Sequence, residues 1–246
     1  MALALPDTAV ARLALARADD ALVLGHRLSE WCGHAPTLEE DLALANTALD
    51  LIGQARALYG LAGDACGIDE DQLAYLRDER GYRNLLLVEQ PNGDFARTIV
   101  RQFLYSAFID PYWRASARGP EPLLAAIAAK AEKESAYHLR HSAEWLIRLG
   151  DGTAESHRRA QDALDRLWPY TAELFEPVDA VGEVAPETLR PTWEATLDTV
   201  LASATLTRPA NGWMHGGGRQ GRHSEHLGHL LAELQYLQRA HPGATW

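Results

Sequence analysis

Acidic residues interrupt two apolar patterns of helical period. Asp50 and Glu134 each lie within such a pattern, and His138 follows Glu134 by about one turn. Carboxylate and imidazole side chains on facing helices are the ligands with which helical bundles hold a pair of metal ions. Two of the helices must each carry a carboxylate and a histidine three residues apart, because that spacing puts both on one inward face. No aspartate or glutamate of this chain has a histidine three residues after it.

The positions where those pairs would stand are Asp50 with Gly53 and Glu134 with Tyr137. Glycine and tyrosine replace the two histidines, so we predict no metal ligands here and treat all four positions as degenerate. A glycine at residue 53 would instead allow another helix to approach closely. Two interpretations of the remaining groups stay open. Asp50, Glu134 and His138 form an irregular metal set, or they form a buried ion-pair or hydrogen-bond network that fixes the register of the helices.

The other candidate groups give weaker signals. His223, His226 and His229 are spaced so that the three rings fan out around a helix, which favours a surface or an interface with another chain over a metal site. No phosphate-binding glycine motif and no nucleophile elbow occur in the chain. We therefore predict no catalytic and no cofactor-binding residues.

Helical signals dominate the elements that position these groups. The first long helix begins after Asp7 and ends before Gly33, and Thr37 with Glu40 predicts a capping box at the start of the second. Pro111 is expected to kink or end the third. The predicted long helices cover residues 7–33, 37–61, 94–111, 122–150, 153–175, 192–206 and 221–240, with short helical pieces at 69–89.

Two of these helices show a clear apolar stripe, which we expect to be buried. The stripe of the second helix is Leu38, Leu42, Ala45, Leu49, Ile52 and Tyr59. The stripe of the fourth is Leu124, Ile127, Ala131, Glu134, His138, Trp145 and Leu149.

Length and composition limit the function classes. The 246 residues, 47% of them hydrophobic, predict one domain over residues 1–246. A formal net charge of −11 opposes nonspecific binding to nucleic acid or to anionic lipid. Charged residues interrupt the apolar N-terminus before it could form a membrane span, and Cys32 and Cys66 are too few for a disulfide framework. A cytoplasmic protein without a membrane or nucleic-acid partner is expected.

Several runs along the chain resemble the C subunits of multicomponent phenylacetyl-CoA epoxidases. They are EWCGHAP (30–36), DLALAN (41–46), LDLIGQAR (49–56), NLLLVEQPNG (84–93), EHLG (225–228) and QYLQR (235–239). The resemblance covers nearly the whole chain. It implies an all-α fold, a ferritin-like four-helix bundle with additional C-terminal helices.

The resemblance also implies a division of labour. The homologous catalytic A subunit of the epoxidase would carry the di-iron centre, and electrons would come from NADPH through a separate reductase subunit. The A subunit would epoxidise the ring of phenylacetyl-CoA in aerobic phenylacetate breakdown. The present chain would be a structural subunit without a cofactor of its own, and Asp50 and Glu134 would be remnants that need a positive partner such as Arg56, Lys130 or Arg140.

Phenylacetyl-CoA could touch this chain in a groove between the two subunits. Gly81, with arginines at positions 77, 80 and 83 around it, is one candidate contact. The loop of Val178, Asp179 and Ala180 is the other. The simpler interpretation of the turn at Gly81 is a charged turn exposed to solvent.

Overall fold

The computed structural model describes residues 7–64, 66–178 and 184–244, and these form helices and connecting loops without a strand. The α-helices are α1 (Ala9–Ser29), α2 (Leu38–Asp64), α3 (Glu70–Tyr75), α4 (Leu86–Glu89), α5 (Phe95–Ser116), α6 (Pro122–Gly150), α7 (Ala154–Leu167), α8 (Arg190–Ser203), α9 (Glu225–Leu234) and α10 (Tyr236–Ala240). Short 3₁₀ helices are η1 (Glu79–Gly81), η2 (Trp168–Tyr170), η3 (Ala172–Phe175), η4 (Pro186–Leu189) and η5 (Gly218–Gln220). Among the described residues, no helix is both long and apolar enough to cross a membrane.

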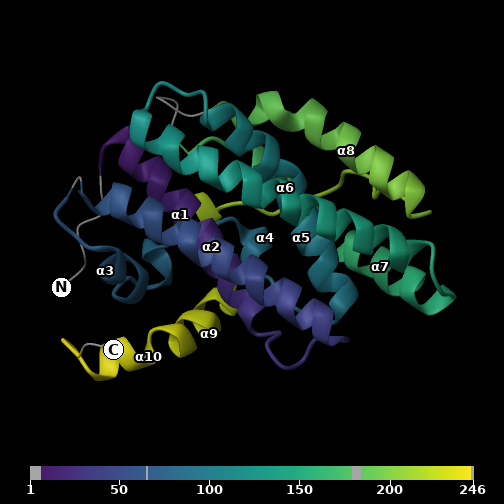
Figure 1. The fold of residues 1–246 in the computed structure, drawn as a ribbon, viewed down its shortest axis with the longest axis horizontal. Coiled ribbons are helices and arrows are strands. Elements are labelled where there is room, and N and C mark those ends of the chain that lie inside the picture. Colours follow the sequence, from purple (N-terminus) through teal and green to yellow (C-terminus); the bar gives the residue numbers. More distant parts are fainter. Residues whose placement is uncertain (1–6, 65, 179–183, 245–246) are drawn as a thin grey trace.

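Four long helices make the body of the protein. α1 packs most extensively on α2, and α5 on α6, while α2 also touches α6 (Figure 1). Short connections join the helices within each pair, and the longer segment carrying α3 and α4 links the pairs. This is a four-helix bundle with one long crossover connection, as ferritin-like folds have. Together with α7 to α10, it confirms the predicted ferritin-like bundle with additional C-terminal helices.

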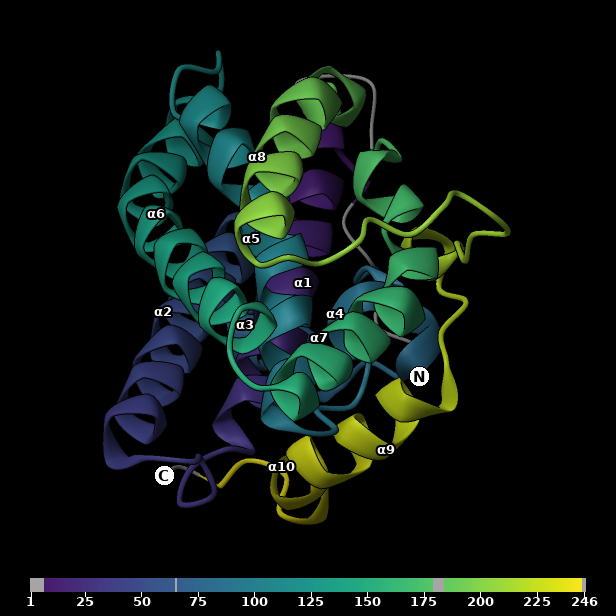
Figure 2. The same ribbon diagram turned by 90° about the vertical axis from the view of Figure 1, so that its right-hand side faces the viewer.

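The extra helices cover different sides of the bundle. α7 and α8 pack against α5 and α6, and α9 lies beside η1 near α10 (Figure 2). In both ribbon views α2 and α6 lie on one side of the molecule, which no other long helix covers.

The helix ends largely follow the sequence signals. The side chains of Thr8 and Asp94 cap α1 and α5 by accepting backbone N–H groups of the first turn. Pro111 does not end α5, which continues to Ser116. At the start of α2 the Thr37 hydroxyl accepts the Glu40 N–H at 3.4 Å, but the Glu40 carboxylate binds His141 instead of completing the predicted capping box.

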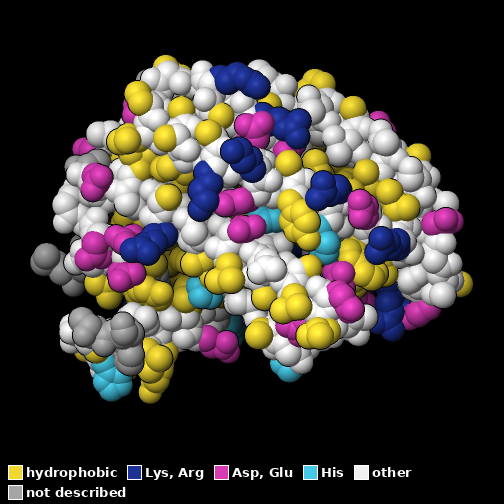
Figure 3. Space-filling view, in the orientation of Figure 1, with side chains coloured by type: hydrophobic (Ala, Val, Ile, Leu, Met, Phe, Trp, Pro, Cys, Tyr) yellow, Lys and Arg dark blue, Asp and Glu magenta, His cyan; other side chains and the backbone are white. Residues whose placement is uncertain are grey.

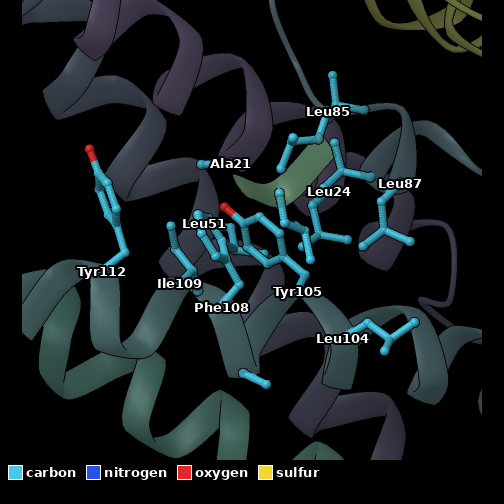
Figure 4. Close-up of a cluster of buried hydrophobic side chains, with 14 of the residues drawn as sticks. Ala21, Leu24, Leu51, Leu85, Leu87, Leu104, Tyr105, Phe108, Ile109 and Tyr112 are labelled. Atoms are coloured by element: carbon cyan, nitrogen blue, oxygen red, sulfur yellow. The ribbon is translucent and has the colours of Figure 1, made fainter. Parts of the chain in front are cut away.

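Apolar side chains fill the space between α1, α2 and α5. Leu24 of α1, Leu51 of α2 and Tyr105 and Phe108 of α5 belong to one buried cluster (Figure 4). Close packing of such side chains supplies the main driving force of folding. The same cluster extends to residues of α9, so the C-terminal helices share the core.

The buried stripe predicted for α2 is wrong for three of its members. Leu38, Leu42 and Leu49 are 72%, 58% and 66% exposed, although Tyr59 is buried. The face that packs on α1 instead carries the buried residues Leu44, Ala48, Leu51, Ala55 and Leu58. Both sets recur at spacings of three and four, so α2 is apolar on two faces and periodicity alone cannot choose between them.

The stripe of α6 is displaced by a smaller angle. Leu124, Ala131 and His138 are buried as predicted, whereas Ile127, Trp145 and Leu149 are only half-buried. The fully buried positions between them are Ala128, Ser135, Ser142 and Leu146. The small residues among them, Ala128, Ser135 and Ser142, let α6 approach its neighbours closely.

Candidate functional site

Asp50 and His138 meet at the seam between α2 and α6. Nε2 of His138 lies 3.0 Å from Oδ2 of Asp50. The histidine side chain is 2% exposed and the aspartate side chain 39% exposed, so the pair bridges the core and the surface. One nitrogen of the imidazole, Nε2, is therefore engaged by a protein carboxylate.

Glu134 lies one turn away and is also satisfied by protein groups. Its carboxylate accepts a hydrogen bond from Gln54 Nε2 at 2.8 Å, and Lys130 Nζ lies 3.5 Å from it. Lys130 is one of the three predicted charge partners. Of the other two, Arg56 instead pairs with Glu70 at 3.2 Å, and Arg140 lies over the ring of Tyr137 at 5.4 Å.

Gly53 and Tyr137 do not face the interior of the bundle. A Cβ atom built on Gly53 would meet no described atom within 4 Å, so the close helix approach expected there is absent. Tyr137 is 41% exposed, and its ring stacks on that of His141 with centroids 6.0 Å apart. The predicted degenerate positions thus follow the outer edge of the α2–α6 seam instead of converging on a central point.

The donor set of this seam does not fit a pair of iron ions. A dimetal site of this fold requires four carboxylates and two histidines projecting inward. Here the seam offers Asp50, Glu134 and His138, and the apolar cluster of Figure 4 occupies the adjoining core. Among the residues that the structure describes, no three histidine, cysteine or acidic side chains come together as a metal site would require.

The three histidines near the C-terminus lie in different environments. His223 precedes α9 and is buried, with Nδ1 2.8 Å from Glu89 and Nε2 3.1 Å from the Tyr82 carbonyl oxygen. His226 is half-buried and His229 exposed. The three rings do not converge on one point, as predicted. The expected surface position is wrong for His223, because its side chain is buried. Burial lowers the pKa of His223, but the bond to Glu89 and its charge outweigh this effect and raise the pKa above its ordinary value.

The arginine turn around Gly81 is mostly internal structure. Arg77 is buried and donates to Asp19 and to the Gly81 carbonyl oxygen at 3.0 and 2.9 Å. Burial lowers the pKa of Arg77, yet the neighbouring Asp19 charge more than reverses that effect. Arg83 donates to the carbonyl oxygens of Arg80 and Tyr82, at 2.6 Å each. Only Arg80 of the three arginines is left exposed to solvent.

The second candidate contact for an acyl-CoA is only partly described. Val178 packs against the hydrophobic core just after η3. Asp179 and Ala180 lie outside the described residues. The structure therefore places one residue of this loop, Val178, beside the core.

Sequence reasoning missed a buried cluster of carboxylates. Asp20 accepts hydrogen bonds from Arg219 at 2.7 and 3.0 Å and from the Leu85 N–H at 2.8 Å. Glu173 accepts three backbone N–H groups, from Leu86, Gly217 and Gly218. We call Asp19, Asp20, Glu89 and Glu173 the buried carboxylates; each side chain joins segments far apart in the sequence.

Asp19 and Asp20 hold residues 77–85 and Arg219 against α1. Glu89 and Glu173 join residues 217–224 to α4 and η3. Burial raises the pKa of Glu173, while the backbone donors and Arg219 lower it again in part. One sequence signal was available: Asp19 and Asp20 stand side by side inside the apolar first helix. Buried charges of this kind require partners, but those partners come from distant segments and cannot be identified by helical spacing.

Comparisons with known proteins identify the family of this chain. Residues 3–246 match the family model described as phenylacetic acid catabolic protein. The chain is 51% identical over 236 residues to the C subunit of the 1,2-phenylacetyl-CoA epoxidase of Escherichia coli (strain K12), and the match covers 93% of this chain and 95% of that protein. The resemblance drawn from the sequence runs is thereby confirmed. This chain belongs to the phenylacetic acid catabolic protein family.

Proposed function

We propose that this chain is the noncatalytic structural subunit of a phenylacetyl-CoA epoxidase complex. The E. coli relative, which matches almost the entire chain, is the C subunit of that enzyme by name. The observation that carries the noncatalytic assignment is the α2–α6 seam. There His138 is bound by Asp50, and Glu134 by Gln54 and Lys130, so the groups that could ligate metal are already engaged.

The chemistry belongs to the partner in this proposal. A homologous catalytic A subunit holds the di-iron centre and binds the ring of phenylacetyl-CoA, and a reductase subunit delivers the electrons. The present chain contributes a rigid bundle whose interior charges are neutralised by arginine, histidine and backbone N–H groups. The complex is placed in the cytoplasm, where its reductant is available.

An acyl-CoA contact from this chain has two candidate places in the proposal. Arg77 and Arg83 are used within the chain, so the turn at Gly81 offers only Arg80 as an exposed cation. Val178 with Asp179 and Ala180 remains the alternative contact for phenylacetyl-CoA at the groove between the subunits.

Metal analysis of two preparations tests the assignment. The chain is purified alone and in complex with the catalytic subunit, and iron and manganese are measured per chain. We expect iron only where the catalytic subunit is present. About two tightly bound transition-metal ions per chain in the isolated protein would show an active dimetal site and refute the proposal.

A substitution in the seam gives a second test. Glu134→Gln keeps the shape of the side chain and removes its charge, so the iron content and turnover of the assembled complex should stay within about twofold of wild type. Glu233→Gln, at an exposed position of α9, is the control. A well-folded Glu134→Gln complex whose activity falls a thousandfold would place this carboxylate in the catalytic machinery.

A further inference from the structure

The outward face of α2 carries an apolar row that nothing in the described part of the chain covers. Leu38, Leu42 and Leu49 are the row, with the partly buried Ala45 and Ile52 between and after them. Their spacing alternates between three and four residues, which is the pattern of a helix that packs on another helix. Since α2 already buries a second apolar face against α1, the row is not needed for the core of this chain.

The neighbouring helix α6 presents a basic ridge on the same side. Its exposed charged residues are Lys130, Lys133, Arg140, Glu144 and Arg148, four cations against one carboxylate. Such an excess is unusual for a chain whose net charge is −11. Figure 3 shows Lys and Arg side chains over α6 and hydrophobic side chains over α2 on this face.

The row and the ridge form one continuous surface. The bonds of Asp50 to His138 and of Gln54 to Glu134 tie α2 to α6 along the seam between them. The exposed ring of Tyr137 also lies on this side, beside His138 and His141. At 1.5 Å per residue, the row extends for roughly 20 Å and the ridge for roughly 27 Å.

We propose that this face, the leucine row of α2 with the basic ridge of α6, is the docking surface for the catalytic subunit. The partner presents an apolar helix against the row and carboxylates against the ridge. Charge complementarity decides between occupants. A second copy that met this face symmetrically would set the same basic ridge against it, whereas a different chain can supply carboxylates there. The inference rests on the proposed function, because it takes the catalytic subunit as the partner.

Docking of this kind gives the exposed carboxylate of Asp50 a further role. Its side chain is 39% exposed in the isolated chain and lies between the row and the ridge. A partner seated on both would exclude water from the Asp50–His138 pair and so strengthen it. The degenerate metal positions would then serve to keep the two helices of the interface in register.

The test compares two double variants with wild type. Leu42→Glu with Leu49→Glu places two charges in the row. Tyr236→Glu with Leu237→Glu makes the same change at exposed apolar residues of α10, away from the proposed surface. Affinity for the purified catalytic subunit is measured by titration calorimetry, and the folding of each isolated variant by its urea midpoint.

We expect the row variant to bind the catalytic subunit at least a hundredfold more weakly with an unchanged midpoint, and the α10 variant to bind like wild type. Lys133→Glu with Arg140→Glu should lower the association rate and flatten its dependence on salt. A row variant that binds as tightly as wild type would overturn the proposed surface. Wild type that fails to bind at all would instead defeat the proposed function.

Sedimentation of the isolated chain tests the alternative that a second copy of the chain covers this face. A wild-type dimer that the row variant abolishes would show that a second copy covers the face, and would overturn the assignment to the catalytic subunit. A monomer at all concentrations, together with the loss of affinity described above, supports it.

Discussion

Asp19→Asn tests whether the buried carboxylates hold the fold together. In wild type the Asp19 carboxylate accepts hydrogen bonds from Arg77 at 3.0 Å, from the Tyr59 hydroxyl at 2.6 Å and from the Arg83 N–H at 2.7 Å. The Asp19 and Arg77 side chains are 0% and 1% exposed. Asparagine keeps the size of the side chain and one carbonyl oxygen, but it leaves the Arg77 guanidinium in the core without its carboxylate.

The expected loss is large. Removing one partner of a buried ion pair costs about 3–5 kcal/mol, because the other charge stays desolvated. Folded domains have unfolding free energies of roughly 5–15 kcal/mol, so the variant loses about a fifth or more of the total. With a urea slope of about 3 kcal/mol/M, the unfolding midpoint falls by roughly 1–1.7 M.

Urea unfolding followed by circular dichroism measures the difference. Arg56→Gln is the matched control, because it breaks an ion pair to Glu70 that is largely exposed and should leave the midpoint unchanged. An Asp19→Asn midpoint within experimental error of wild type would refute the view that this pair clamps the segment at Arg77 to α1.

Two further outcomes follow from the same structure. The pKa of His223 is raised by Glu89, so the stabilisation from this pair is fully present below a pH of about 6.5 and is lost as pH rises through the folded-state pKa. The difference in unfolding free energy between wild type and His223→Gln should therefore shrink from pH 6 to pH 9. A difference that is constant with pH would contradict this. Gly150→Ala places a Cβ atom 2.1 Å from the Ala204 carbonyl oxygen and should destabilise by about 1–3 kcal/mol. Gly53→Ala meets open space in the middle of a helix and should stabilise by up to about 1 kcal/mol; thermal melts that rank the two glycine variants in the opposite order would show that the helix contacts are misplaced.

The fold could be predicted because its signals are local. Caps, glycines and apolar periodicity mark where long helices begin and end, and α6 (Pro122–Gly150) matches the predicted range. The same signals could not choose the inward face of α2. Leu49 and Leu51 are two residues apart and both belong to stripes of helical period, yet one is exposed and the other buried. The choice depends on what α1 presents, which is tertiary information.

The site was harder to predict for a related reason. The missing histidines at Gly53 and Tyr137 were visible as residue types, but whether those positions face inward depends on the rotation of each helix. The partners of the buried carboxylates come from far along the chain, as Arg219 does for Asp20 across 199 positions. Sequence spacing constrains contacts within a helix and says nothing about such distant pairs.

The buried carboxylates Asp19 and Asp20 are balanced by arginines of the chain itself. A bundle whose carboxylates were balanced only by metal ions would be left with uncompensated buried charge once the ions were gone. In this chain Asp19 is balanced by Arg77 and Asp20 by Arg219, side chains that fold with the polypeptide. Under the proposed function, this balance would let the bundle stay folded without a metal ion of its own.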